Sequence, residues 1–224
     1  MSHAAPPAHY TSMGLDSRKM GFWAFIGSEC LLFGSLISTY LVYQGRSVAG
    51  PTPSQILNIP VTSISTFDLL MSSLWMVLAL AAVQRGDMKW AKIWLLGVAI
   101  GGTIFLGFQF YEFSSFVREG LTMQANLFGC TFFILTGTHG AHVTVGVLWM
   151  LTLWFRALKG KLGPQHAMTV EIAGLYWHFV DVVWIVIFTL VSQSLSFSLR
   201  LRWFLRGLYS LPSLQWARVH FSAR

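Results

Sequence analysis

Five long apolar stretches constrain the fold of this chain more than any other feature. They cover residues 20–43, 66–84, 93–113, 126–155 and 172–192 of the 224. A helix needs about 20 consecutive apolar residues to cross the hydrocarbon core of a bilayer, and each stretch meets or approaches that length. Only 10% of the residues are charged, against about 25% in a typical soluble domain. We therefore predict an all-α integral membrane protein that folds as a bundle of five transmembrane helices.

The segments between and around these stretches predict the domain organisation. Residues 45–65 contain Pro51, Pro53 and Pro60 and are expected to form a loop, because proline disrupts helices. The second span is then barely long enough, and Asp68 stands at its entrance near the membrane interface. We expect residues 1–17 to form a flexible segment, residues 18–193 to form the single five-helix domain, and residues 194–224 to form a tail.

The tail carries five arginines and no acidic residue. Two structures are compatible with this composition: an interfacial segment that binds anionic lipid or a neighbouring subunit, and a poorly ordered extension. The net charge is +7, and subtracting the five tail arginines leaves +2. Because the remaining basic charge is spread over short loops, we predict no nucleic-acid binding.

Lysine and arginine are distributed unequally between the two sides of the predicted bundle. One side holds eight of them: Arg18, Lys19, Arg85, Lys89, Lys92, Arg156, Lys159 and Lys161. The other side holds only Arg46 and Arg118 outside the tail. Loops rich in lysine and arginine remain in the cytoplasm, so we predict a cytoplasmic N-terminus. The arginine-rich tail would then lie on the side that the same rule disfavours.

Small residues at helical spacing indicate close contacts between helices. Gly97 and Gly101 form one pair and Gly137 and Ala141 another, with Gly102, Gly140 and Gly146 nearby. In lipid, such pairs let two helices approach closely. The cysteines Cys30 and Cys130 have no metal-ligand spacing and are expected to be buried, inert thiols.

Glu29 is the most conspicuous ionisable residue of the first span, since it lies near the middle. No cation occupies the same helix turn, and removal from water penalises the charged form of a carboxyl group. Two interpretations are open. Glu29 is a reactive carboxyl that handles protons, or a neutral carboxylic acid that hydrogen-bonds to another helix.

Further polar residues lie in the third, fourth and fifth spans. Gln109 and Glu112 are near the end of the third, where Glu112 is expected to be a polar helix end. His139 and His142 in the fourth span share one helix face, since residues three apart do so. The same spacing relates His178 and Asp181 in the fifth span.

Three intramembrane histidines suggest a haem or metal site, but the pattern argues against one. Two histidines three apart on one helix cannot both be axial ligands of one haem, and no cysteine pair supports a metal site. We predict no metal ligand. The imidazoles are expected to hydrogen-bond to Glu171, Asp181 or lipid headgroups and so to hold the last two helices together.

Four ordered motifs resemble one protein family. Residues 176–184, Tyr-Trp-His-Phe-Val-Asp-Val-Val-Trp, are preceded by Glu171 and resemble the signature of subunit III of haem-copper terminal oxidases. Ser28-Glu29, the Gln-Phe-Tyr-Glu-Phe of residues 109–113 and the Thr-Gly-Thr-His-Gly-Ala-His-Val of residues 136–143 are similar to three other elements of that family. The resemblance covers residues 18–191, and five spans correspond to the short bacterial form.

The resemblance implies a non-redox subunit of a respiratory cytochrome c oxidase, which reduces oxygen to water and translocates protons. Haem and copper then lie in partner subunits, and this chain contributes no catalytic residue. It stabilises subunit I, holds phospholipid in a helix cleft and supports proton uptake. The implied partners are subunit I as the main contact and subunit II, with a small subunit IV as a further candidate. The implied location is the bacterial plasma membrane, which the chain crosses several times.

The resemblance also implies roles for individual residues. Glu29 matches the family's reactive buried carboxyl. The polar framework between helices comprises Gln109, Glu112, His139, His142, Glu171, His178 and Asp181. Candidate lipid contacts are Trp23, Trp177 and Arg156.

Three alternatives remain at the level of sequence. The first is subunit III of a quinol oxidase, which has the same short form. The second is a small proton-coupled transporter with Glu29 and Asp181 as carriers, although no inverted repeat of the kind found in transporters is apparent. The third is a b-type cytochrome ligated through His139 or His142 together with His178.

Overall fold

The computed structural model describes residues 16–43, 59–118, 120 and 127–209. It contains α1 (Ser17–Tyr43), α3 (Ile59–Gln84), α4 (Met88–Arg118), α5 (Leu127–Leu158) and α6 (Ala167–Tyr209), with a short 3-10 helix, η1 (Pro164–His166), before α6. Within these described ranges, five helices are long and apolar enough to cross a membrane. The predicted all-α class and the five long apolar helices are confirmed.

The second long helix, α3, begins earlier than predicted. It starts at Ile59, so the expected loop over residues 45–65 is too long and the second span is 26 residues in length rather than marginal. Pro60 does not prevent this, because the first turn of a helix has no partner for the N–H that proline lacks. Asp68 lies nine positions after the start of α3, and its interfacial position stays a prediction.

The two ends of the described chain lie close to the predicted boundaries of the N-terminal segment and within the predicted tail. Asp16 caps α1, because its Oδ1 accepts a hydrogen bond of 2.9 Å from the backbone N–H of Arg18. At the other end, α6 continues past residue 193 to Tyr209. The rest of the tail, residues 210–224, lies outside the described residues, as do residues 1–15 of the N-terminal segment. The division of the chain at residues 17 and 193 remains a prediction.

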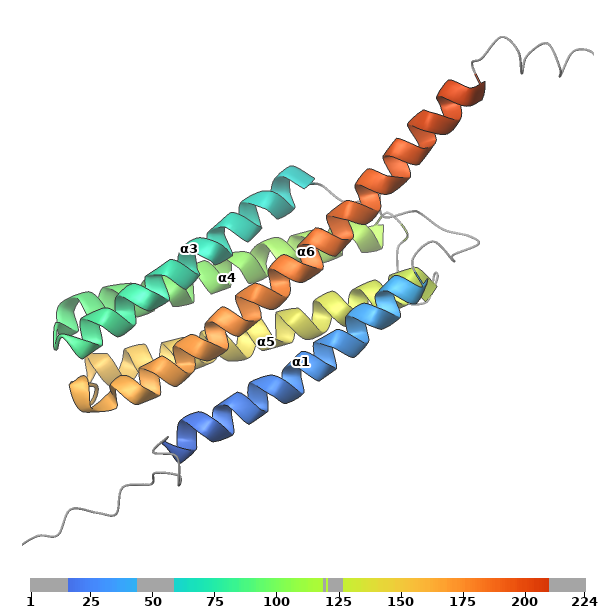
Figure 1. Cartoon of the computed structure of the whole chain (residues 1–224). Helices are drawn as coiled ribbons and strands as arrows, with labels where there is room; N and C mark the ends of the chain where they lie inside the picture. Colours follow the sequence, from blue (N-terminus) through green and yellow to red (C-terminus); the bar gives the residue numbers. More distant parts are fainter. Residues whose placement is uncertain (1–15, 44–58, 119, 121–126, 210–224) are drawn as a thin grey trace, which may run out of the picture.

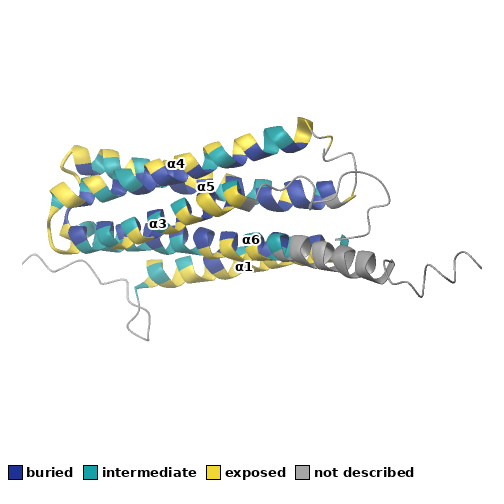
Figure 2. Ribbon diagram, turned by 90° about the horizontal axis from the view of Figure 1, so that it is seen from above, coloured by how far each residue is buried: buried dark blue, intermediate teal, exposed yellow. Residues whose placement is uncertain are grey.

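Four helices form a closed ring, and α1 lies outside it. In this ring α3 contacts α4, α4 contacts α5, α5 contacts α6, and α6 contacts α3. Helix α1 lies along α5 and α6 at one edge of the bundle (Figure 1). Buried residues line the facing sides of the helices, whereas the outer faces are exposed (Figure 2). The outer faces expose leucine, isoleucine and phenylalanine, which are the kinds of side chain that face the hydrocarbon of a bilayer.

Tight turns keep neighbouring helices antiparallel. Gly86 follows α3 with φ of 78° and Gly160 follows α5 with φ of 66°, in the left-handed region where glycine is favoured. The backbone N–H groups of Asp87 and Lys161 donate back to the carbonyls of Ala82 and Arg156. These bonds satisfy carbonyl groups that the helix ends leave unpaired.

The centre of the ring is organised around Trp177 of α6. Its indole is 1% exposed and lies in a slot between Gly102 of α4 and Gly146 of α5. A Cβ built on Gly102 would stand 2.5 Å from this indole, and one built on Gly146 would stand 2.8 Å from it. The two glycines therefore create the space that this indole fills.

Candidate functional site

Glu29 of α1 and His142 of α5 meet between the two helices. His142 Nε2 lies 3.1 Å from Glu29 Oε2, and both side chains are largely buried. His142 Nδ1 lies 2.8 Å from the carbonyl oxygen of Thr138. A carbonyl only accepts hydrogen bonds, so Nδ1 carries a hydrogen.

The tautomer of His142 limits where the proton between Glu29 and His142 can lie. With hydrogen on Nδ1, the contact at Nε2 has two chemical forms. Either neutral imidazole accepts from the carboxylic acid of Glu29, or imidazolium donates to its carboxylate. In both forms the Glu29–His142 pair shares one proton across the α1–α5 boundary. Both residues were predicted to be functional but not to contact each other, although each lies close to the middle of its own helix.

An open cleft of about 510 Å³ lies beside this pair. Its walls come from α1, α5 and α6 and are mainly aromatic and aliphatic. The residues that line it are Phe22, Phe25, Ala141, His142, Val145, Trp149 and Tyr176. Tyr176 Oη donates a 3.0 Å hydrogen bond to the backbone carbonyl of His142, which secures the inner wall. The Glu29–His142 pair is thus the main polar feature at an apolar cleft.

A second polar contact holds α1 near its first turn. Lys19 Nζ donates to Glu171 Oε1 of α6, and both side chains are partly exposed. Glu171, one of the three expected kinds of partner for the imidazoles, contacts this lysine instead. Polar contacts therefore join α1 to its neighbours at two positions, Lys19 and Glu29.

The α3–α6 boundary contains a separate series of hydrogen bonds. Ser73 Oγ lies 2.6 Å from His178 Nδ1. Asp181 is also buried, and its Oδ1 has no hydrogen-bond partner among the described residues. The indole N–H groups of Trp177 and Trp184 donate to Ser72 and Thr66.

The hydroxyl groups of α3 were not singled out from the sequence. Ser72, Ser73 and Thr66 are all buried, and each accepts or shares a hydrogen bond from α6. The signal that could have identified them is the concentration of serine and threonine over residues 62–73. Inside lipid, the polar groups of a helix need hydrogen-bond partners within the protein. Serine and threonine are nevertheless common in such helices, so the composition alone does not select a partner.

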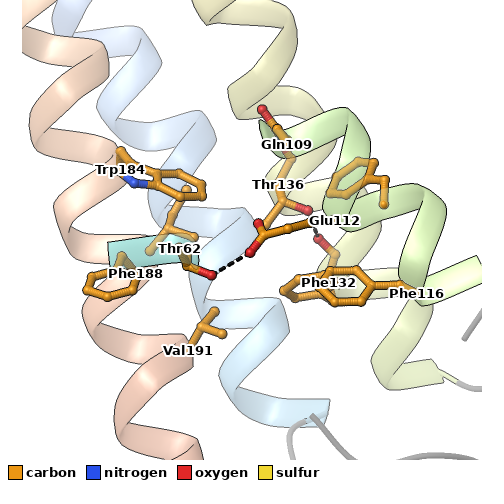
Figure 3. A pocket seen from close by; sticks show the side chains of 11 residues that line it. Thr62, Gln109, Glu112, Phe116, Phe132, Thr136, Trp184, Phe188 and Val191 are labelled. Carbon is orange, nitrogen blue, oxygen red and sulfur yellow. Dashed lines mark hydrogen bonds between the residues drawn. The ribbon is translucent and has the colours of Figure 1, made fainter. Parts of the chain in front are cut away.

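Glu112 is buried inside the bundle, so its predicted role as a polar helix end is wrong. Figure 3 shows its carboxyl facing Thr62 of α3, whose Oγ1 donates to Glu112 Oε1. One turn away, Gln109 Nε2 donates a 2.7 Å bond to the backbone carbonyl of Thr136 on α5. The enclosed space among these residues measures about 20 Å³, too small for a cofactor or a lipid chain. Glu112 and Gln109 therefore connect α3, α4 and α5.

His139 differs from the other two intramembrane histidines. It is completely buried, and neither ring nitrogen has a hydrogen-bond partner among the described residues. Its ring stacks on Trp184 with centroids 4.9 Å apart, and Phe33 and Phe105 meet it edge-on. The expected hydrogen bond to an acid is absent in the part of the chain that the structure describes.

Other expectations can be compared with the positions of the side chains. Trp177 was a candidate lipid contact, but it is enclosed by α3, α4 and α5, so this assignment does not fit its burial. Trp23 is 54% exposed and Arg156 is partly exposed in the last turn of α5. The expected burial of the thiols is wrong, because Cys30 is exposed and Cys130 is intermediate.

Potential metal ligands were also compared with the structure. In the described ranges, no three histidine, cysteine or acidic side chains are grouped as a metal site would require. Four of the described histidines and acids, Glu29, His142, Glu112 and His178, contact one another or a hydroxyl group across a helix boundary. Such contacts join helices.

Comparison with known proteins gives a consistent result. The family model described as Cytochrome c oxidase subunit III matches residues 4–193. Cytochrome c oxidase subunit 3 of Bacillus sp. (strain PS3) is 40% identical over 188 residues, which cover 84% of this chain and 90% of that protein. Quinol oxidase subunit 3 of Bacillus subtilis (strain 168) is 38% identical over 183 residues, covering 82% and 90%. Cytochrome c oxidase subunit 3 of Alkalihalophilus pseudofirmus is 37% identical over 188 residues, covering 83% and 91%.

Proposed function

The chain belongs to the cytochrome c oxidase subunit III family and is a multi-pass membrane subunit of a bacterial haem-copper oxidase, and we propose that its complex is a cytochrome c oxidase. In this proposal the complex reduces oxygen to water and translocates protons. Haem and copper lie in partner subunits. This chain carries no redox centre and supports subunit I, with subunit II and a small subunit IV as further partners.

The observation that carries the proposed supporting role is the Glu29–His142 pair beside the open cleft. The pair holds one proton in either of its two forms, because Thr138 occupies the other imidazole nitrogen. A group that keeps one proton in a largely apolar setting can exchange it with a neighbouring acceptor. We assign Glu29 and His142 to support of proton uptake, with the N-terminus on the cytoplasmic side, as the positive charges favour.

The cleft is proposed to hold the acyl chain of a phospholipid. Its lining is mainly aromatic and aliphatic, and it opens to the outside of the bundle, where lipid chains are the surrounding solvent. Trp23 and Arg156 are the proposed contacts at the membrane interface, where tryptophan and arginine favour the headgroup region. A lipid chain seated there would complete the contact of α1 with the other helices.

One experiment tests the supporting role directly. The complete complex and a complex purified without this chain are compared for activity during sustained turnover and for bound phospholipid. We expect the complex without the chain to lose activity faster and to retain less lipid. Equal activity over time together with equal lipid content would overturn the role.

A cleft-filling variant locates the lipid more closely. Val145→Trp places a large side chain in the cleft, and it should reduce the phospholipid that co-purifies with the complex. Leu148→Trp is the matched control, because Leu148 is exposed on α5 and does not line the cleft. If both variants retain the lipid of the unmodified complex, the chain is bound elsewhere.

A quinol oxidase is the second candidate, because the relatives include a quinol oxidase subunit 3 at 38% identity. The two candidates differ in the electron donor, which partner subunits bind. The purified complex is supplied separately with reduced cytochrome c and with a reduced quinol, and oxygen consumption is followed. Turnover with the quinol alone would replace the cytochrome c proposal. The transporter and b-type cytochrome hypotheses have no support from the family.

A further inference from the structure

A small cavity lies inside the bundle, near the end of the ring where α3 begins and α4 ends (Figure 3). It measures about 20 Å³. It is separate from the open cleft beside the Glu29–His142 pair, because the two spaces share no lining residue. Most of its wall is aromatic and aliphatic and comes from α4, α5 and α6: Phe113, Phe116, Phe132, Trp184, Ile187 and Phe188.

The polar side chains around this cavity bond to the protein. Thr62 Oγ1 donates to Glu112 Oε1 across the α3–α4 boundary. Thr136 Oγ1 donates a 2.7 Å hydrogen bond to the backbone carbonyl of Phe132 on its own helix. Gln109 Nε2 donates a bond of the same length to the backbone carbonyl of Thr136. These bonds leave an apolar surface facing the cavity.

The remaining oxygen of Gln109 does not change this character. Gln109 Oε1 is buried without a hydrogen-bond partner among the described residues. It lies against α5, since a Cβ built on Gly140, which does not line the cavity, would stand 2.8 Å from it. A buried water molecule needs two to four polar partners, and the apolar walls do not supply such a set. The lining therefore favours an apolar guest over water.

The size of the cavity limits this guest to one small molecule. One water-sized molecule requires roughly 10–15 Å³ in this measure, and apolar cavities inside proteins stay dry and bind small apolar guests such as xenon. We propose that the cavity is a binding site for one small apolar molecule of the size of a dissolved gas, held between Phe116, Phe132 and Trp184. The attraction is dispersion, because a guest supplies the contacts that the walls of a void lack.

The first test uses xenon as the probe. Crystals of the purified complex are placed under xenon pressure, and anomalous scattering locates the bound atoms. We expect a xenon peak inside the cavity. The absence of a peak there, or density for an ordered water that xenon does not displace, would overturn the proposal.

A filled cavity shows that the site itself holds the guest. Val191 lines the cavity, and Val191→Phe should abolish the xenon peak. Val186→Phe is the matched control on the same helix, because Val186 is exposed and does not line the cavity, so the peak should remain. If Val191→Phe prevents assembly, Val191→Leu adds a single methylene and should lower the xenon occupancy. A peak that is unaffected by filling, or one that Val186→Phe also removes, contradicts the proposal.

A second test separates a site that works at ordinary gas pressure from binding under xenon pressure only. The full chain in detergent carries fluorotryptophan at position 184, and the ¹⁹F relaxation rate is measured under air-level dioxygen and under dinitrogen. Dioxygen is paramagnetic, so a bound molecule should speed the relaxation of this wall residue, whereas dinitrogen should not. Val191→Phe should remove most of the increase and Val186→Phe should retain it. An equal increase in all three proteins would mean that the cavity takes up gas only under pressure, and the proposal would fail.

Discussion

Helix α1 and the four-helix ring of α3, α4, α5 and α6 are held together in different ways. In the ring, Trp177 fills a slot between Gly102 and Gly146 so closely that a methyl group on either glycine would collide with it. In α1, the buried residues are Ile26, Phe33 and Tyr40, seven apart, so they form a single narrow seam. In an apolar stretch of 18 residues within α1, only 11% of the residues are buried, against 56% in the corresponding stretch of α6.

This difference explains where the cleft lies. Shape complementarity, which supplies most of the attraction between helices in lipid, is extensive in the ring and sparse along α1. Two polar contacts, Glu29 with His142 and Lys19 with Glu171, supplement the seam of α1. A helix held by a seam and two polar contacts leaves space beside it, whereas helices held by interlocking surfaces do not.

The largest expected effect comes from blocking the Trp177 slot. Gly102→Ala adds a Cβ 2.5 Å from the indole and 2.6 Å from Val147, and overpacking of this kind costs about 1–3 kcal/mol or more. The free energy of unfolding of the purified chain should fall by about 3 kcal/mol. Gly27→Ala on α1 is the matched control, because no atom lies within 4 Å of that Cβ. Equal effects of the two substitutions would remove the distinction between ring and α1.

The next largest effect concerns the side chain that fills the slot. Trp177→Phe leaves part of the slot empty and removes the hydrogen bond to Ser72, so unfolding should become easier by about 2 kcal/mol. Trp23→Phe on the exposed face of α1 should change stability by less than about 0.5 kcal/mol. Both are read from unfolding curves in the same detergent. A larger loss for Trp23→Phe would mean that α1 depends on its outer face.

A smaller and more local effect is expected at the Glu29–His142 pair. His142→Leu removes the interhelical hydrogen bond, which is worth about 0.6–1.7 kcal/mol in membranes, and should let α1 move away from α5 while the ring stays intact. Spin labels at Leu31 and Leu148, both exposed, report the distance between the two helices. We expect a broader and longer distance distribution; an unchanged one would show that the apolar seam alone positions α1.

The smallest effect is expected for the contact of Lys19 with Glu171. Both side chains are about one-third exposed, and ion pairs of this kind contribute about 0–1 kcal/mol. Lys19→Met should therefore shift the α1–α5 distance distribution less than His142→Leu does, and high salt should have a similarly small effect on the unmodified chain. If Lys19→Met releases α1 more than His142→Leu, the order of the two contacts is reversed.

Much of the fold was predictable, because hydropathy specifies it. The hydropathy of a segment is the sum over its own residues and does not depend on distant parts of the chain. A run of apolar residues predicts a membrane helix whatever its neighbours are, so the five spans were found from residues 20–192 alone. The boundaries were less predictable. Pro60 was taken as evidence against a helix, but its effect depends on whether it lies in the first turn or the interior, and that is decided by where the chain meets the bundle.

The sequence predicted which residues belong to the candidate site, but it did not predict which of them contact one another. Glu29, His142, His178 and Asp181 were identified because polar residues are rare in apolar runs. Their partners depend on the rotation of each helix, which hydropathy does not determine. Gly101 packs against Ser72 as the predicted small-residue pair required, whereas no atom lies within 4 Å of a Cβ on Gly137. The same spacing therefore marks a close contact at Gly101 and none at Gly137.

The sequence by itself determined that this is a multi-pass helical membrane protein, and its four ordered motifs identified the oxidase subunit III family. Both conclusions rest on local composition and residue order, which need no knowledge of the tertiary structure. Only the tertiary structure decided that Trp177 lies between Gly102 and Gly146, that Glu29 meets His142 beside the cleft, and that His139 has no hydrogen-bond partner among the described residues. These features depend on how helices cross and rotate, and packing between distant side chains sets that geometry.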